Sequence, residues 1–321
     1  MKPKKLTNML LIAAIAGAAA NGAANAQTFP AKVIHVVLPF GPGGASDVAT
    51  RITASGLERE FKHPVIVENK PGAGGLLGSV FVAKAPADGY TLLMASTFFP
   101  SIPVAMKEPQ IDIRKDFAPI SEVADWATLL GSSMKAPFSD FRQMVAYAKA
   151  NPGKLNYGST GLGDTFLALE LIKGQLGLSI TNVPYKDGAS YSMALMTGEV
   201  QLAWVTGART LQERDKIRPL LVTGAHRLPE FPDAPSCSEM RLECAENTWM
   251  GLLAPRGTPV EVIERVHGGI VSAVAQPQTI EALAKNSFNA VASTPDAFNK
   301  FIEAGIARWV MVAKQTGLKP Q

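Results

Sequence analysis

Three loops rich in glycine and hydroxyl side chains are the segments of this sequence best suited to chemistry. They span Gly41–Asp47, Gly72–Gly75 and Ser159–Thr165, and each lies between a strand-like and a helix-like segment. Glycines let the backbone turn so that several N–H groups face one point, and a following helix adds the partial positive charge of its N-terminus. Such a loop can hold an anion without lysine or arginine. Three of them at strand ends favour an anion site over tight turns alone.

Dinucleotide binding is a weaker interpretation of the first loop. Gly41-x-Gly43 after a strand resembles the start of a G-x-G-x-x-G fingerprint, but Pro42 intrudes and Ser46 occupies the third glycine position. We therefore expect no nucleotide cofactor, and no cofactor of any other kind.

Hydrolysis would need a nucleophile with a base within hydrogen-bond reach. Ser46 or Ser159 could be the nucleophile, but of the four histidines only His226 follows a strand where it could approach a cleft. Asp47 and Asp164 are better interpreted as helix caps than as an acid–base pair. The scattered histidines and cysteines have no metal-ligand spacing, so we expect no metal site. We expect a protein that is not an enzyme, with an exported hydrolase kept as an alternative.

The loops are positioned by alternating strands and helices. The apolar, β-branched run Val33–Leu38 is typical of a buried strand in a parallel sheet. Further strands are expected at 65–68, 90–95, 128–132, 155–158, 179–184, 200–205, 218–223 and 249–254, and helices from a cap at Ser46 or Asp47 to 61 and at 77–85, 140–150, 165–176, 191–197, 259–275, 279–286 and 294–316. This order predicts an α/β fold with mostly parallel sheets flanked by helices.

The length of the chain and its closing helices predict two domains. The helices after residue 259 must bury an apolar face, so we expect the chain to return to its first domain. The expected division is 27–127 with 249–321 as a discontinuous domain I, and 128–248 as an inserted domain II. Two crossing strands between the domains would permit hinge closure on a ligand.

Residues 1–26 have the pattern of a secretory signal peptide. A basic start, Met1–Lys5, precedes the uncharged, apolar run Leu6–Ala20, and Ala24-Asn25-Ala26 provides the small residues of a cleavage site. We expect cleavage after Ala26 and a mature protein in the periplasm. A membrane anchor would need a longer apolar run.

The mature chain is nearly neutral. The whole chain has 31 basic and 27 acidic residues, and the leader holds three lysines and no acid, which leaves 28 against 27. This balance does not favour nucleic-acid binding. Cys237 and Cys244 could pair in an oxidising compartment or stay as free thiols.

Several aromatic residues lie near expected strand ends, namely Phe99, Trp126, Tyr185 and Trp204. They either pack in the core or line a cleft that suits a ligand with a flat apolar body. Arg209 follows the strand that contains Trp204, and it could be a surface charge or could meet a second carboxylate bidentately.

Several short motifs, in order along the chain, resemble those of a known family. They are Leu38–Asp47, Val67–Gly75, Ala87–Leu93, Lys115–Ile120, Ala150–Leu155, Val183–Lys186 and Trp249–Pro255. By their number, order and spacing the sequence, over about residues 30–318, resembles the Bug family of solute-binding receptors of tripartite tricarboxylate transporters.

The resemblance implies a periplasmic binding protein of type II, a two-domain "Venus flytrap". Such a receptor would hold a small carboxylate (a dicarboxylate, an amino acid or an aromatic carboxylate) through backbone amides and bridging waters of Gly41–Asp47 and Ser159–Thr165. The expected ligand-binding residues are Phe40, Pro42, Gly43, Gly44, Ser46, Asp47, Gly74, Ser96, Ser159, Thr160, Gly161, Gly163, Asp164, Thr165, Tyr185, Asp187 and Trp204. The implied partners are the membrane permease subunits of the transporter, and we expect a monomer. A sensor that presents the bound carboxylate to a two-component signalling system is an alternative.

The sequence departs from the family pattern at three positions. Leu167 stands near the usual place of a histidine, Asp187 replaces a glycine, and Ala194 replaces an aspartate. An acid at 187 could favour a ligand with an amino group, or could be a solvated turn residue.

Overall fold

The computed structural model describes residues 29–160, 164–244 and 247–316. The chain divides into a short unit, Met1–Ala31, and one compact unit, Lys32–Gln321. The expected leader and its cleavage point after Ala26 lie outside the described residues. No helix within the described ranges is both long and apolar enough to cross a lipid bilayer.

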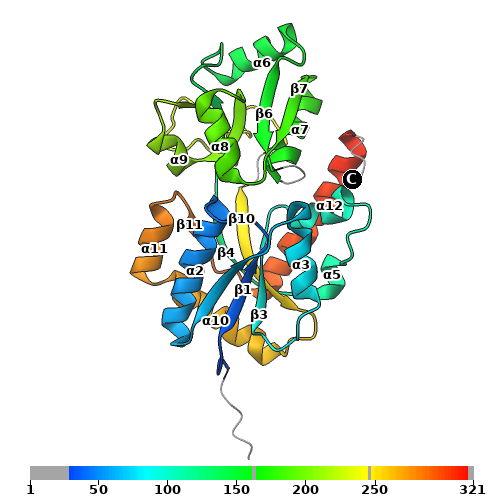
Figure 1. Cartoon of the computed structure of the whole chain (residues 1–321), viewed down its shortest axis with the longest axis vertical. Coiled ribbons are helices and arrows are strands. Elements are labelled where there is room, and N and C mark those ends of the chain that lie inside the picture. The colour runs from blue at the N-terminus through cyan, green and yellow to red at the C-terminus, as the bar shows by residue number, and fades with distance from the viewer. Residues whose placement is uncertain (1–28, 161–163, 245–246, 317–321) are drawn as a thin grey trace, which may run out of the picture. The chain divides into compact units, whose positions relative to one another are not determined.

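The described part of the larger unit contains two β-sheets with helices packed on them (Figure 1). Sheet A has the strand order β11-β4-β10-β3-β1-β2. Its strands are β1 (Ile34–Leu38), β2 (Val65–Asn69), β3 (Thr91–Ser96), β4 (Phe117–Trp126), β10 (Thr248–Pro255) and β11 (Asn289–Ala290). β1 is parallel to β2 and β3, whereas β10 is antiparallel to both of its neighbours, β3 and β4.

Sheet B has the strand order β7-β6-β8-β5-β9. Its strands are β5 (Thr128–Ser133), β6 (Leu155–Ser159), β7 (Ile180–Pro184), β8 (Leu202–Thr206) and β9 (Ile217–Val222). β6 is parallel to β7 and β8, and β5 is antiparallel to β8 and β9. The α/β class with mostly parallel strands is confirmed, and in each sheet one long strand, β10 or β5, runs antiparallel to both of its neighbours. The cause is the same in each sheet, because β5 and β10 are the strands by which the chain enters one sheet from the other.

The chain crosses between the sheets twice. Ala127 alone separates β4 of sheet A from β5 of sheet B, and residues 223–247 lead back from β9 to β10. We call residues 223–247 the return segment. The strands of sheet B are thus continuous in sequence, while sheet A is built from both sides of them. We retain domain limits at 128 and 249 as a proposal that follows these crossings.

The helices lie against the two sheets (Figure 1). Those that follow strands of sheet A are α2 (Ala45–Phe61), α3 (Leu76–Ala83), α4 (Ile102–Ala105), α5 (Ile113–Asp116), α10 (Val260–Val274), α11 (Pro277–Ala284) and α12 (Pro295–Thr316), with short 3₁₀ turns η1 (Ala73–Gly75) and η2 (Phe99–Ser101). Those that follow strands of sheet B are α6 (Phe141–Ala150), α7 (Asp164–Leu176), α8 (Gly188–Thr197) and α9 (Gly207–Gln212).

Apolar periodicity explains how the longest helix packs. In α12, Phe298, Ile302, Ile306 and Trp309 recur at helical spacing and are all nearly fully buried. The first three join the core of sheet A with Leu93 and its neighbours. The closing helix therefore packs on the sheet that the beginning of the chain starts, as its apolar face requires.

The start of α2 differs from the expectation. The N-cap is Gly44, with no side-chain cap, rather than Ser46 or Asp47, which lie inside the first turn. The Asp47 side chain instead accepts a hydrogen bond from the amide of Gly43, the residue before the N-cap.

Cys237 and Cys244 form a disulfide within the return segment, with Cα atoms 5.6 Å apart. The Cys237 amide donates to the Val222 carbonyl oxygen at the end of β9. The disulfide therefore closes a tight loop that is hydrogen-bonded to sheet B.

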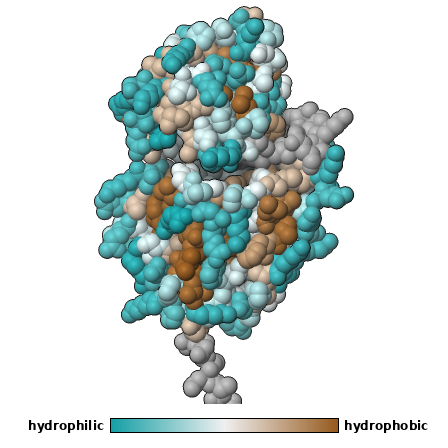
Figure 2. All heavy atoms as spheres, viewed as in Figure 1, coloured by the Kyte–Doolittle hydropathy of each residue, from teal (hydrophilic) through white to brown (hydrophobic). Residues whose placement is uncertain are grey.

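Exposed apolar side chains are present on one face of sheet A (Figure 2). Leu77 and Phe81 of α3 and Ile66 of the edge strand β2 are about half exposed. The Lys70 ammonium group lies 4.3 Å from the centre of the Phe81 ring and covers part of this surface.

Candidate ligand-binding site

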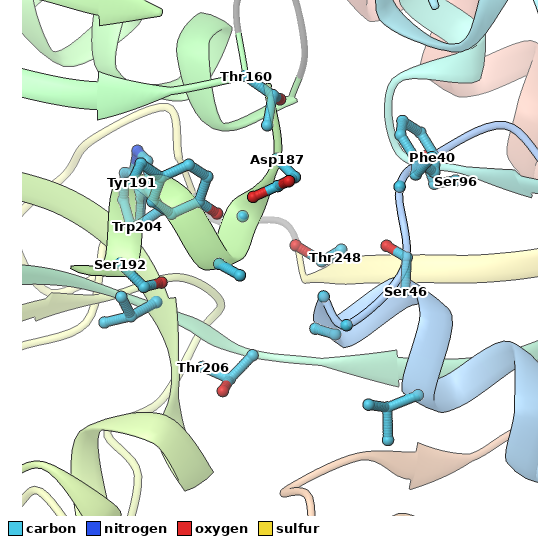
Figure 3. A pocket seen from close by; sticks show the side chains of 18 of the residues that line it. Phe40, Ser46, Ser96, Thr160, Asp187, Tyr191, Ser192, Trp204, Thr206 and Thr248 are labelled. Carbon is cyan, nitrogen blue, oxygen red and sulfur yellow. The ribbon is translucent and has the colours of Figure 1, made fainter. Parts of the chain in front are cut away.

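A cavity of about 430 Å³ lies where the carboxyl-end loops of sheet A meet those of sheet B. From sheet A it is lined by the loops after β1, β2 and β3, by Trp126 and Thr248 at the crossings, and by Asn286 and Phe288 before β11. From sheet B it is lined by Thr128, Thr160, the start of α8, the end of β8 and α9. Figure 3 shows Phe40, Ser46 and Ser96 across the cavity from Tyr191, Ser192 and Trp204. This is the meeting place that strand direction predicts for ligand binding in open α/β sheets.

The loop after β1 presents main-chain amides to the cavity. Gly43 has a φ of +83°, which glycine adopts without strain. A Cβ atom added at Gly43 or Gly44 would meet no atom within 4 Å, so the space beside this loop is open. Because Gly44 offers no side-chain cap, the amides of the first turn of α2 are left for another acceptor.

The loop after β2 contributes a second glycine turn. Gly72, Gly74 and Gly75 all have positive φ, and a Cβ on Gly72 would lie only 2.4 Å from Leu77 Cδ1. Glycine is therefore required at Gly72. This glycine turn borders the same cavity, but the amides where α3 begins are already paired, since Gly75 and Leu77 donate to the Gly72 carbonyl oxygen and Leu76 donates to that of Ala73.

Asp47 supports the first loop from behind and is not among the lining residues. Its carboxylate accepts from the Gly43 amide at 3.1 Å, Arg51 Nε at 3.0 Å and Asn69 Nδ2 at 3.0 Å. Asn69 Nδ2 also donates to the Phe40 carbonyl oxygen. Burial alone would raise the pKa of Asp47, but the hydrogen bonds from Arg51, Asn69 and Gly43 outweigh it and lower the pKa below its ordinary value. The carboxylate thus stays charged and fixes the loop.

Thr160 and Ser159, at the end of β6, have different surroundings. Thr160 is exposed and lines the cavity. Ser159 is fully buried, does not line it, and donates from Oγ to Asn182 Oδ1 at 2.7 Å. Gly161 and Gly163 lie outside the described residues, and Asp164 and Thr165 are described only as the first residues of α7.

Asp187 lines the cavity as the N-cap of α8. Its Oδ1 accepts from both the amide and the hydroxyl of Ser190, and its Oδ2 lies 4.0 Å from Lys186 Nζ. The hydrogen bond from the Ser190 hydroxyl, the largest cause, and the charge of Lys186 lower the pKa of Asp187. The acid is already used as a helix cap.

Aromatic side chains form much of the cavity wall. They are Phe40, Phe98, Trp126, Tyr185, Tyr191, Trp204 and Phe288. The Trp126 and Phe288 rings pack with centroids 4.5 Å apart. Burial and a hydrogen bond to Glu199 raise the pKa of Tyr185 to about 12, so this hydroxyl stays neutral and already has a partner. Phe99 does not line the cavity and instead packs edge-on against Phe117 in the core.

Ten of the residues expected to bind ligand line the cavity: Phe40, Gly43, Gly44, Ser46, Gly74, Ser96, Thr160, Tyr185, Asp187 and Trp204. Pro42, Asp47 and Ser159 do not line it. Sequence reasoning missed Phe98, Tyr191, Ser192, Thr206, Thr248, Asn286 and Phe288. Of these, Thr206 had a usable signal, because a threonine directly before a helix start commonly caps it, and here it accepts from the Arg209 amide.

The cavity offers little to a hydrolytic mechanism. No histidine is among the described lining residues, and His226 is exposed elsewhere. A search of the described residues finds no group of three or more His, Cys, Asp or Glu that could hold a metal ion.

Known proteins share this sequence and fold. Residues 49–318 match the family model described as tripartite tricarboxylate transporter family receptor. A UPF0065 protein of Bordetella pertussis is 34% identical, with all of both chains covered. Protein BugT of the same organism is 32% identical over 98% of this chain and 99% of BugT.

Solved structures agree in fold. Rpa4515 of R. palustris with adipate has a TM-score of 0.85 and 30% identity over 91% of this chain and all of that chain. The periplasmic binding protein BugD has a TM-score of 0.85 and 27% identity over 91% and 100% of the two chains. MatC from Rhodopseudomonas palustris with bound malate has a TM-score of 0.81 and 25% identity over 88% and 99%. The resemblance to Bug receptors is thereby confirmed, and the chain belongs to the tripartite tricarboxylate transporter family of receptors.

Proposed function

We propose that this protein captures a small carboxylate in the cavity between its two sheets and delivers it to a tripartite tricarboxylate-type membrane transporter. The observation that carries the proposal is the uncapped start of α2 at Gly44, which borders the cavity beside the glycine turn of residues 72–75. Main-chain amides and the helix dipole there suit an anion. The bound adipate and malate of two structural relatives support a carboxylate as that anion.

The proposed ligand contacts come from both sheets. On sheet A they are the amides of residues 44–46 and the Ser46 and Ser96 hydroxyls, and on sheet B they include Thr160. The aromatic wall would cover the body of the ligand. Open space beside Gly43 and Gly44 leaves room for bridging waters, which bind nearly as well as direct contacts.

We also propose that the protein acts in the periplasm after removal of residues 1–26. The composition of that segment and the periplasmic relatives support this location. The permease of such a transporter is the proposed partner, in keeping with the family.

Thermal denaturation of residues 27–321 with a panel of carboxylates tests the proposal, with neutral amides of the same shapes as controls. The panel contains mono- and dicarboxylates, acidic amino acids and aromatic acids. A ligand at 100 times its Kd adds about 2.7 kcal/mol to the free energy of unfolding, which should raise Tm by several degrees. We expect at least one acid to raise Tm while its full amide does not. Equal shifts with acid and amide, or no shift across the panel, would contradict carboxylate capture.

A further inference from the structure

We propose that Arg209 determines specificity by binding a second carboxylate of the ligand on the sheet B side of the cavity, whereas the glycine loops line it from the sheet A side. This inference rests on the proposed function and adds to it a residue that distinguishes diacids from monoacids. The starting observation is the set of charged side chains that line the cavity in the described part of the chain, which are Lys186, Asp187 and Arg209.

Two of these charges are already matched. Asp187 Oδ1 is held by Ser190, and Lys186 Nζ faces Asp187 Oδ2 at 4.0 Å. Asp187 is therefore poorly available for an amino group of a ligand, and Lys186 is largely exposed to solvent.

Arg209 is the cation of the lining without a counter-charge. Among the described residues, its guanidinium group has neither a hydrogen bond nor an ion pair, and only its main chain is used: the amide donates to Thr206 and the carbonyl oxygen accepts from the Glu213 amide. Glu213, four residues later on the same helix, could have paired with it. Glu213 instead pairs with Lys216 at 2.7 Å.

The surroundings of Arg209 complete a polar end to the cavity. Thr206 and Gln212 of sheet B and Asn286 of sheet A line the cavity with it. Asn286 Nδ2 donates to the Ala282 carbonyl oxygen, which fixes that side chain. Gly207 also approaches sheet A closely, because a Cβ there would lie 3.3 Å from Ser287 Oγ.

The cavity lining thus combines two places for negative charge with apolar walls. The amides at the start of α2 suit one carboxylate, and the planar guanidinium fork of Arg209 suits another, which it can bind through two parallel hydrogen bonds. Trp126, Trp204 and Phe288 provide flat surfaces for the part of the ligand that joins the two acids.

The experiment compares diacids with their half-amides by titration calorimetry. The probes are adipate, isophthalate and terephthalate, and the matching half-amides are adipic acid monoamide, 3-carbamoylbenzoate and 4-carbamoylbenzoate. Each half-amide keeps one carboxylate, the shape and the length, and loses the second charge. We expect the wild-type protein to bind at least one diacid about tenfold or more tighter than its half-amide.

The variant Arg209→Gln should bind that diacid about as weakly as the wild type binds the half-amide, while the affinity for the half-amide should barely change. Since the side chain has no hydrogen bond to any residue that the structure describes, the ligand-free Tm should also be unchanged. Arg214→Gln is the matched control, because Arg214 is an exposed arginine just beyond α9 that does not line the cavity. It should leave the preference for the diacid intact.

The outcomes separate this inference from the proposed function. If diacid and half-amide bind the wild type equally well, or if Arg209→Gln weakens both equally, Arg209 does not bind a second carboxylate, although carboxylate capture stands. If Arg214→Gln abolishes the preference as fully as Arg209→Gln does, the effect is long-range electrostatics and the inference also fails. If none of the six acids binds while other acids of the thermal panel do, the ligand is not a diacid of this size and the assignment is wrong. If no acid binds at all, both proposals fail.

Discussion

Thr160 and Ser159 show how adjacent hydroxyl side chains can have different roles. Thr160 faces the cavity, whereas Ser159 is buried and hydrogen-bonded to Asn182. Thr160→Val removes a hydroxyl from the cavity at nearly constant shape, so we expect a several-fold loss of affinity for the best acid of the panel, with an unchanged ligand-free Tm. Ser159→Ala should cost about 1 kcal/mol of stability by removing a buried hydrogen bond and should leave affinity nearly unchanged.

Calorimetry and thermal denaturation of both variants check this pair. The opposite pattern, with affinity lost in Ser159→Ala and retained in Thr160→Val, would return the ligand contact to Ser159. Strand alternation could have separated the two residues from sequence alone, but only once the buried face of β6 was known.

The partly buried side chain of Glu122 in strand β4 should make the stability of the protein depend on pH. Desolvation by burial, with a smaller contribution from the charge of Asp125, raises the pKa of Glu122 to about 7. The native state therefore holds a proton that the unfolded chain releases at the ordinary pKa of 4.5. Between these two values the native state binds more protons, so this group makes stability fall as pH rises through that window.

The substitution Glu122→Gln should remove this loss of stability with rising pH. We expect the variant to be more stable than the wild type by about 1 kcal/mol at pH 8 and equally stable near pH 4, as measured by chemical denaturation. Glu281→Gln is the control, because Glu281 is exposed and paired with Lys285 at 2.8 Å, and it should give no gain at pH 8. A constant difference between wild type and Glu122→Gln at both pH values would show that the carboxyl group titrates normally.

At the scale of elements, the sequence predicted most strands and helices and the mostly parallel sheets, but not that β5 and β10 run antiparallel to their neighbours. The pattern of apolar and glycine residues located β1, α2 and the loops that line the cavity. The long strand β4 was missed, since its burial alternates irregularly and two register shifts interrupt its pairing with β10. The direction of β5 and β10 depends on where the chain re-enters a sheet, which no local pattern records.

The missed cavity residues have a similar explanation. Phe288 and Asn286 lie far from the glycine loops in sequence and reach the cavity only because the segment after α11 packs beside Trp126. Tyr191 and Ser192 depend on which side of α8 faces the cavity, and Phe98 rather than Phe99 lines it because consecutive side chains of the turn after β3 point in different directions. Local pattern finds loops at strand ends, but tertiary packing decides which side chains complete a wall.

At the scale of the molecule, a ligand in the cavity should affect both sheets together. The lining includes residues 43–46, which follow β1 of sheet A, and residues 185–189, which follow β7 of sheet B. Hydrogen exchange measured with and without a saturating acid from the panel should therefore show slower exchange in both segments. Helix α6, which does not line the cavity, should exchange equally in the two states. Protection limited to one sheet would mean that the ligand contacts only that sheet.

The position of β10 has a consequence for the order in which the chain can fold as it is synthesised. Sheet B is encoded without interruption and can close before residue 248 exists, but the strand pairs of β4 within sheet A are with β10 and β11, both of which come later. Until then β3 also has one edge open. A growing chain thus carries a complete sheet B on an unfinished sheet A. The last quarter of the sequence joins β4 to the other strands of sheet A, so the central strand β10 is the last of the long strands of this sheet to be made.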